Sequence, residues 1–584
     1  MVAEQLGNTL VASIESGKVE SNPIKRKPTR YRYLSKRDFK DQRLRAVSAH
    51  GRDDIGNSTE TIKHSRMSVA LRAVYLLLIF SPVIISAPLA YIIPIFRNYI
   101  WFKLLVNIIG DSTKYFFNIC TVLFHFILPN RVISKKLIHS LTKGSSGAAF
   151  IKWGQWSSTR PDMFPEDLCI ALSSLHARAP IHSFSFTKQL IKSEFGYDIL
   201  EMFDSFGSKP IASGSIAQVY RAKLDNKDVA VKVRHPNVVE QIQLDFIILK
   251  AFAAFVEAIP GLSWLNLSAS LSQFSETIGA QTRLDVEGVN LILLNHNFRR
   301  NKQVNFPRPL LMSESVLVES YEDGTCVSEY TDIYSNKGEA LPRPLDLAHF
   351  ILVEGENLYL KMLLIDNLMH ADLHPGNILV RGGVSNDKIN DDNEDRKKSR
   401  ITNRNKQIIL VDAGMVAVLN KEEQKNYIGL LAAIGRGNGK EAADYVLNFS
   451  KKSVYSKEKI RKFRAEMVEL FKIDCKGYGT GTDLGRVLRG VLGLVRKNQI
   501  TIDANYATLV LNSLCLDGLG GQILPEYNVM DAAKPYLEFY RVARKTVGVW
   551  LFYALVPVSR WHKGIADGAF LRKLKKKMVR KQNS

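Results

Sequence analysis

The sequence predicts an α+β protein with two lobes, preceded by a helical extension and by a membrane-anchor segment. Two runs that alternate apolar and polar residues, 219–224 and 228–233, indicate a hairpin around Asn226 and Lys227 in a β-rich lobe. Much later in the chain, polar residues border short apolar runs at 370–377 and 412–414, which indicates loops on a second, larger lobe. The 584 residues are enough for both lobes and for extensions.

Composition and patterning divide the chain into six parts. These are a disordered basic targeting region (1–66), a hydrophobic helical region (67–130), a helical extension (131–206), a β-rich lobe (207–325), a larger lobe (326–560) and a basic tail (561–584). Within the larger lobe, the polar and charged residues 384–407 lack apolar periodicity, which predicts a disordered surface insert.

The hydrophobic region contains a candidate membrane span. Residues 73–96 include no charged side chain, and about 20 apolar residues suffice to cross a hydrocarbon layer of about 30 Å. A buried helical hairpin packed on the core is the alternative. The preceding residues 1–66 favour a targeting sequence, but Glu4, Glu15 and Glu20 leave a disordered arm as an alternative, because transit peptides are normally poor in acids.

The formal net charge of +23 is concentrated at the two ends of the chain. Clusters of lysine and arginine lie at 25–37 and at 572–581. Such clusters indicate a partner rich in phosphate, either nucleic acid or an anionic lipid surface. We expect membrane lipid rather than nucleic acid, because no array of base-stacking aromatic residues accompanies the charges.

The β-rich lobe carries the first candidate site residues. Small side chains at Ala212, Ser213, Gly214 and Ser215 precede the hairpin, and small residues let backbone N–H groups approach phosphate oxygens. Lys232 on the second strand is placed to neutralise those phosphates. A lysine in this role needs a carboxylate to hold it. The best candidate is Glu287, on a plausible helix, and Glu276 is a rival.

Two further motifs follow in the larger lobe. In HADLHPGNILV, Asp372 and Asn377 stand five residues apart, the spacing by which a kinase catalytic loop presents a carboxylate to the attacking hydroxyl and an amide oxygen to Mg²⁺. His370 is expected to support this loop. Asp412 ends an apolar strand just before the turn at Gly414, and with Asn377 it makes the oxygen-rich site that Mg²⁺ requires.

The order of these motifs predicts a two-lobed protein-kinase-like fold that binds ATP or ADP with Mg²⁺. Between them, the apolar run that ends at Glu319 and Tyr321 lies where an interlobe hinge would hydrogen-bond adenine through its backbone. We expect Lys232 and the magnesium ion to bind the phosphates, and Asp372 to orient a water or a small hydroxyl for attack on the γ-phosphate.

The segment AAFIKWGQWSSTRPDMFP, ahead of these motifs, resembles a signature that ordinary protein kinases lack. Its Lys152 and Gln155 are similar to the KxGQ motif of the UbiB/aarF-domain (ABC1) atypical kinase-like family, and the resemblance covers roughly residues 140 to 540. It implies that the extension folds over the nucleotide cleft, with Lys152 and Gln155 as gating residues. It also implies an ATPase or small-molecule kinase of ubiquinone or lipid metabolism.

The resemblance further implies a location and partners. With the hydrophobic segment ahead of the core, it favours the mitochondrial branch of the family and the inner membrane, a plastid or other organelle membrane being the alternative. Quinones or their precursors, membrane lipids and proteins of quinone metabolism are the implied partners, besides the nucleotide.

Two departures from the family pattern limit this transfer. Gly214 flanked by serines replaces an alanine-rich loop, and Arg283 stands where an aspartate is expected. Two other functions therefore stay open. One is a pseudokinase scaffold that binds nucleotide without turnover. The other is a conventional protein Ser/Thr kinase, which needs an open peptide platform, and residues 141–180 argue against that.

Overall fold

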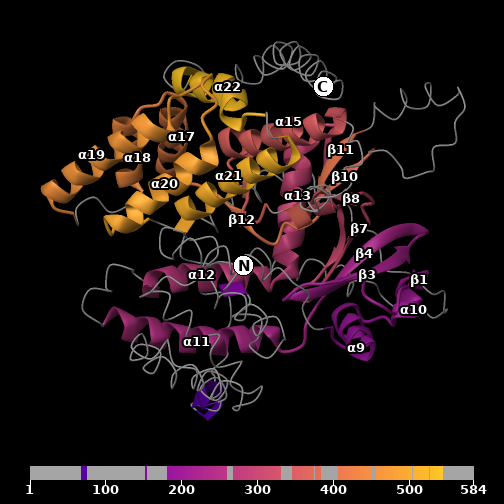
Figure 1. Ribbon diagram of the computed structural model, residues 1–584. Helices are drawn as coiled ribbons and strands as arrows, with labels where there is room; N and C mark the ends of the chain where they lie inside the picture. Colours follow the sequence, from indigo (N-terminus) through magenta and orange to yellow (C-terminus); the bar gives the residue numbers. More distant parts are fainter. Residues whose placement is uncertain are drawn as a thin grey trace, which may run out of the picture.

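A computed structural model describes the parts of the chain that form the two lobes, shown in Figure 1. The described residues are 67–70, 72–74, 152–153, 181–258, 267–329, 345–373, 375–382, 406–449, 455–502, 504–524 and 527–543. They combine a sheet-containing lobe with a helical lobe, as the α+β prediction requires.

The hairpin at the centre of the first lobe is longer than the sequence predicts. Strands β3 (Ala217–Leu224) and β4 (Lys227–Arg234) pair along all eight residues. The turn lies at Asp225 and Asn226, with φ of 51° and 60°, and not at Asn226 and Lys227 as we predicted. The difference has a physical reason: a two-residue turn of this hand needs positive φ at both positions, which Asp and Asn tolerate and Lys does not.

This hairpin belongs to a six-stranded sheet in the order β1-β3-β4-β7-β6, with β2 beside β3. The other strands are β1 (Ser205–Phe206), β2 (Ala212–Ser213), β6 (Pro309–Met312) and β7 (Val316–Ser320). Helices α9 (Phe184–Phe195) and α10 (Ile199–Met202) share a buried apolar cluster with β3, β4 and β7. Helix α13 (Leu284–Phe298) contacts β6 and β7, and its apolar residues join the core of the larger lobe.

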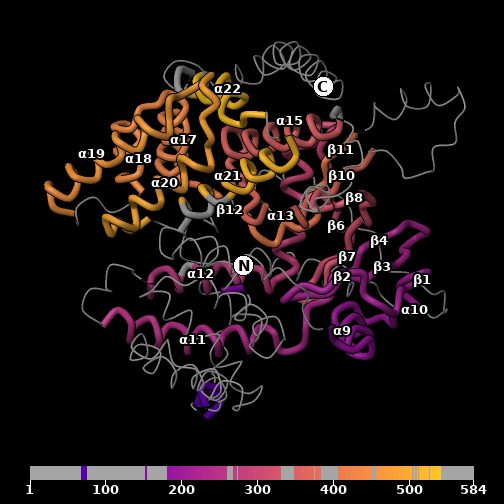
Figure 2. Tube along the Cα trace, in the orientation of Figure 1, coloured from indigo at the N-terminus to yellow at the C-terminus, as the bar shows by residue number. Residues whose placement is uncertain are grey.

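Two long helices, α11 (Val238–Glu257) and α12 (Leu267–Gln281), lie between β4 and α13 in the chain and pack on each other. Figure 2 shows them running side by side below the helical lobe. They have a core of their own, in which the rings of Phe246 and Phe274 lie 5.5 Å apart. Arg72 reaches this pair from the N-terminal side and bonds the buried Asp245 at 2.9 Å.

The larger lobe is mostly helical. Its helices are α15 (Leu345–Lys361), α17 (Lys421–Gly435), α18 (Gly439–Asn448), α19 (Lys457–Asp474), α20 (Leu484–Lys497), α21 (Ala504–Ile523) and α22 (Val529–Ala543). The α15 helix continues into a π-helical turn, Met362–Asp366.

Short strands on this lobe place the predicted loops. One sheet has the order β5-β11-β10-β8, and β9 pairs with β12 separately. Their bounds are β5 (Val304–Asn305), β8 (Thr325–Cys326), β9 (Met369–His370), β10 (Ile378–Arg381), β11 (Gln407–Leu410) and β12 (Val416–Ala417).

Several predicted segments lie outside the described residues, including 1–66, most of the insert 384–407 and the tail 561–584. The candidate span 73–96 also lies outside them, apart from Ala73 and Val74. Among the residues that are described, no helix has both the length and the apolar character needed to cross a membrane.

Gly439 tests the tight packing of α18 on α19. A Cβ at this position would stand 2.8 Å from the carbonyl oxygen of Met467 and 2.9 Å from the Cα of Val468, so backbone would have to move. We expect Gly439→Ala to lower the free energy of unfolding by about 1–3 kcal/mol, because overpacking forces such shifts.

Gly493→Ala is the matched control. This glycine is exposed within α20 and has nothing within 4 Å of an added Cβ, so alanine should stabilise the helix by up to about 1 kcal/mol. Urea unfolding followed by circular dichroism measures both variants. Equal stability of Gly439→Ala and the parent protein would contradict the packing.

Candidate functional site

Lys232 stands at the meeting point of the two lobes. Its ammonium lies 2.5 Å from Oε1 of Glu287 and 3.2 Å from Oε1 of Glu319. It also donates to the carbonyl oxygen of Val411 at 3.0 Å. Only 12% of the lysine side chain is exposed, and the two glutamates are more buried still. One buried cation therefore links β4, α13, β7 and the segment that follows β11.

Strand register explains why these groups converge. Lys232 pairs with Leu317 of β7, so Glu319, two residues further along β7, points to the same face of the sheet as the lysine. Glu287 lies in the first turn of α13. The structure thus brings Lys232 and Glu287 together, while the rival Glu276 lies exposed on α12.

The charges at this point are strongly coupled. Burial alone would lower the pKa of Lys232, but Glu287, Glu319 and Asp412 outweigh it, so the pKa is raised and the lysine stays charged. Burial raises the pKa of Glu319 to about 8, despite the attraction of the lysine. Burial also raises the pKa of Glu287. The pKa of Asp412 is lowered, because Lys232 and the amide of Gly414 outweigh its burial.

His370 ties the predicted catalytic loop together. The amide of Asp372 donates to Nδ1 of this buried histidine at 3.2 Å, so Nε2 carries the proton and donates to the carbonyl oxygen of Asp412. Asn512 on α21 donates to the carbonyl oxygen of His370 at 2.7 Å. The side-chain amide of Asn377 donates to the carbonyl oxygen of Asp372 at 3.1 Å. The three predicted polar residues are therefore held in one network.

Helix α13 holds the segment that carries Asp412. The amide of Gly414 donates to Oδ1 of Asp412 at 2.8 Å, which fixes the carboxylate in the turn. The amide of Ala413 donates to Glu287 at 3.4 Å, and Asn290 donates to the carbonyl oxygen of Ala413 at 2.9 Å. Sequence reasoning missed Asn290. Its position one helical turn after Glu287 was the available signal.

The chemistry of the polar groups suits a magnesium nucleotide. The pairing of β10 with β11 places Asn377 opposite Val411, the residue before Asp412. The side-chain oxygen of Asn377 and the carboxylate of Asp412 therefore belong to neighbouring backbone positions at the ends of the two strands. These are hard oxygen donors, and Mg²⁺ takes its remaining ligands from phosphate and water. No group of three or more His, Cys, Asp and Glu side chains within the described ranges is arranged to hold a metal ion by itself.

Of the predicted phosphate loop, Ala212 and Ser213 form strand β2, and Gly214 and Ser215 lie in the turn between β2 and β3. Gly214 donates through its amide to the carbonyl oxygen of Ala217 at 2.9 Å, which closes a tight turn. On β3, Val219 pairs with Lys232. The loop and the lysine therefore belong to neighbouring strands of one sheet.

The two predicted hinge residues have different surroundings. The amide of Tyr321 donates to the carbonyl oxygen of Asp228 at 3.2 Å, and the guanidinium of Arg221 lies 4.4 Å from the centre of its ring. Glu319 instead directs its side chain at Lys232, and its other oxygen, Oε2, is buried without a hydrogen-bond partner among the described residues. The sequence predicted a backbone role for Glu319, and the structure adds a side-chain contact that was not predicted.

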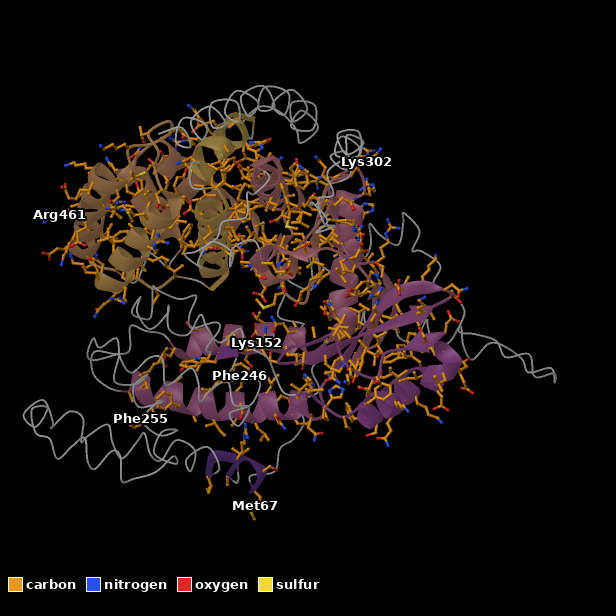
Figure 3. The ribbon with its side chains drawn as sticks, turned by 45° about the vertical axis from the view of Figure 1, so that its right-hand side comes forward. Met67, Lys152, Phe246, Phe255, Lys302 and Arg461 are labelled. Atoms are coloured by element: carbon orange, nitrogen blue, oxygen red, sulfur yellow. The ribbon has the colours of Figure 1, made fainter. Side chains whose placement is uncertain are left out.

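The predicted gating residues are only partly described. Lys152 lies close enough to Asp412 for its charge to contribute to the lowered pKa of that carboxyl group. Figure 3 shows Lys152 beside α12, and the neighbouring Trp153 packs against the α11–α12 core. Gln155 lies outside the described residues.

Arg283, where the family pattern has an aspartate, is engaged in local ion pairs. Its guanidinium bonds Asp285 at 2.7 Å and Glu314 at 3.3 Å. The nearby Gln281 is buried, and its side-chain oxygen has no hydrogen-bond partner in the described part of the chain.

Comparison with known proteins shows that the site residues lie within a region that matches a known domain. Residues 174–446 match the ABC1 atypical kinase-like domain, a range that includes Lys232, Glu287, Asp372, Asn377 and Asp412. The chain is 33% identical over 442 residues to a Dictyostelium discoideum protein named "Probable serine/threonine-protein kinase abkC", covering 67% of this chain and 63% of that protein. The chain thus spans less than two thirds of that relative.

Two other relatives have similar coverage. A mitochondrial ABC1 family protein of Saccharomyces cerevisiae is 29% identical over 68% of this chain and 67% of its own length. A protein of Vibrio cholerae named "Probable protein kinase UbiB" is 28% identical over 67% of this chain and 68% of its own length.

The raised pKa of Glu319 gives a pH-dependent stability. The folded protein keeps this proton up to about pH 8, whereas an unfolded glutamate loses it near its ordinary value of 4.5. Unfolding between these pH values releases the proton, so the stability falls as the pH rises through that window. Glutamine cannot titrate. We therefore expect the melting temperature of Glu319→Gln to fall less than that of the parent protein between pH 5.5 and 8.5.

Differential scanning fluorimetry without nucleotide measures this difference. The exposed Glu422→Gln on α17 is the matched control and should follow the parent curve. Parallel pH curves for Glu319→Gln and the parent would show that Glu319 is ionised in the folded state.

Proposed function

This chain belongs to the UbiB/ABC1 family of atypical kinase-like proteins, and we propose that it binds ATP or ADP with Mg²⁺ at the Lys232 site. We further propose that it acts as an ATPase or small-molecule kinase in quinone or lipid metabolism. The observation that carries the proposal is the buried ion pair of Lys232 and Glu287, bonded directly to the segment of Asp412.

In this proposal each residue has a separate task. Lys232 binds the nucleotide phosphates, and Glu287 holds the lysine in position. Asn377 and Asp412 would hold the magnesium ion, which supplies charge neutralisation for the transferred phosphoryl group. Asp372 orients a water or a small hydroxyl for in-line attack, and His370 fixes the backbone on both sides of this arrangement.

The base is expected beside β7. Glu319 and Tyr321 are the proposed hinge residues, and the buried, unpaired Oε2 of Glu319 is a polar atom that a bound nucleotide could satisfy. The loop of Ala212, Ser213, Gly214 and Ser215 would cover the phosphates.

A second candidate is a scaffold that binds nucleotide with little or no turnover. One observation favours it: Lys232 is shared between two buried glutamates, so a second carboxyl group, that of Glu319, competes with phosphate for the contact with the lysine. Lys152 beside Asp412 adds another positive charge at the proposed metal position. A conventional protein Ser/Thr kinase has no comparable observation in its favour.

The location and partners are also part of the proposal. The Saccharomyces cerevisiae relative is described as mitochondrial, which favours a mitochondrial location for this chain. The uncharged residues 73–96 and the basic ends favour association with a membrane, there with lipid, quinone or quinone precursors. Gating by Lys152 and Gln155 remains a prediction from the family resemblance.

Two substitutions test the catalytic assignment. We expect Asp372→Asn and Asp412→Asn each to lower nucleotide turnover by roughly 100-fold or more, since one loses the orienting carboxylate and the other a metal ligand. The folding of each variant is checked by its melting temperature. Asp444→Asn, a half-exposed position on α18, is the matched control and should keep its turnover.

Turnover and binding together separate the candidates. Phosphate release is measured with purified protein and lipid vesicles, and nucleotide binding with and without Mg²⁺ is measured by calorimetry. Wild-type turnover in both aspartate variants would rule out these assignments. Magnesium-dependent binding with no turnover in the parent protein would favour the scaffold.

A further inference from the structure

A continuous chain of hydrogen bonds connects α9 with the loop between β2 and β3. His235, just after β4, contacts the carbonyl oxygen of Gly214 through Nε2 at 2.9 Å. The Nδ1 atoms of His235 and His182 lie 2.7 Å apart. On its other side, His182 contacts the hydroxyl of Thr187 at 2.9 Å, and Thr187 contacts the hydroxyl of Tyr220 at 2.9 Å.

The direction of every bond in this chain follows from one end. A carbonyl oxygen only accepts, so Nε2 of His235 carries a proton, and in the neutral ring Nδ1 accepts. Nδ1 of His182 must then donate to His235, and its Nε2 accepts from the hydroxyl of Thr187. Tyr220 donates in turn to Thr187 and accepts from the side-chain amide of Gln218.

The surroundings keep this arrangement in one state. Thr187, Gln218 and Tyr220 are fully buried. Burial, together with the neighbouring His235, lowers the pKa of His182 to about 4, and burial also lowers the pKa of His235. Both rings are therefore neutral at physiological pH, and their tautomers are fixed by their neighbours.

Gln218 links the far end of this series of hydrogen bonds back to the backbone of His182. Its side-chain oxygen accepts from the amide of His182 at 3.1 Å, while its nitrogen lies 3.3 Å from the carbonyl oxygen of the same residue. The position of His182 is thus set by β3. The histidine pair, which we call the relay, therefore connects the exposed Gly214 to buried residues of the sheet, whose positions are fixed.

We propose that His235 and His182 are positioning residues that hold the 212–215 loop in the conformation that receives the nucleotide phosphates. The inference rests on the proposed nucleotide site. Ala212 and Ser213 are held by their pairing with β3, whereas Gly214 is exposed beyond this pairing and its amide bonds Ala217, so the contact with His235 adds support at Gly214 itself. Glycine and small residues otherwise leave the loop free to adopt other conformations.

Two substitutions of similar size at His182 test the relay. In His182→Asn, the side-chain NH₂ takes the place of Nδ1 and can still donate to His235. In His182→Leu, no donor remains. We expect His182→Leu to bind magnesium-ATP about threefold to tenfold more weakly, the loss of one hydrogen bond, and His182→Asn to stay within about twofold of the parent.

Adenosine separates a loop effect from general damage. It lacks phosphates, so its affinity should be the same in the parent, His182→Asn and His182→Leu. Equal affinities of the asparagine and leucine variants for magnesium-ATP would overturn the proposal. A parallel loss of adenosine binding in His182→Leu would also overturn it, because it would show damage beyond the loop.

Hydrogen exchange tests the relay without any ligand. Mass spectrometry of the full chain should show faster amide exchange in a peptide spanning 211–218 for His182→Leu than for His182→Asn, with α17 unchanged. If exchange differs in this way but the parent binds no nucleotide, the relay stands and the proposed function fails. If the amide exchange of 211–218 is the same in both variants, the proposed role of the histidine pair is wrong, whatever the nucleotide result.

Thr187→Val covers the case in which His182→Leu does not fold. Valine matches threonine in shape but cannot donate to Nε2 of His182, so the imidazole loses the hydrogen bond that holds it to α9. We expect a shift in the same direction, about twofold in magnesium-ATP affinity, with faster exchange in 211–218. Parent behaviour in both measurements would overturn the proposal.

Discussion

The ammonium of Lys232 is enclosed by two glutamate side chains and by the backbone carbonyl oxygen of Val411 from the larger lobe, and most of the site geometry depends on it. A buried ion is costly unless its partners are close and well hydrogen-bonded, and removing one partner leaves the others uncompensated. Glu287 meets this requirement at 2.5 Å and also accepts from the amide of Ala413. The ion pair is thus a structural joint as well as a candidate binding group.

Helix α13 connects this ion pair to the segment that carries Asp412. Its first turn supplies Glu287, its second supplies Asn290, and both contact the segment next to Asp412. His370 bonds the carbonyl oxygen of Asp412 and also accepts from the amide of Asp372, so it fixes both backbone segments together. Carboxylates that are far apart in sequence are placed because the buried side chains of Glu287, Asn290 and His370 bind the backbone beside them. This explains how a site assembled from distant segments acquires fixed geometry.

The parts of this arrangement that depend on local pattern could be predicted from the sequence. The alternating strand around Lys232 and the spacing of Asp372 and Asn377 are examples. The contact of Glu319 with Lys232 could not, because it depends on the register of β4 against β7, two strands separated by some 80 residues. The hairpin turn was misplaced by one residue, since the identity of the left-handed positions decides it.

The sharing of Lys232 between two glutamates has a consequence for the ligands that the site accepts. An anion that binds the ammonium adds its charge next to the buried carboxyl groups of Glu287 and Asp412, and the local charge then becomes more negative. A bare polyanion therefore meets repulsion at the point where it should bind. A ligand that arrives together with its own cation adds less negative charge than the bare polyanion, so under the proposed function the buried charges would favour the metal complex over the free form.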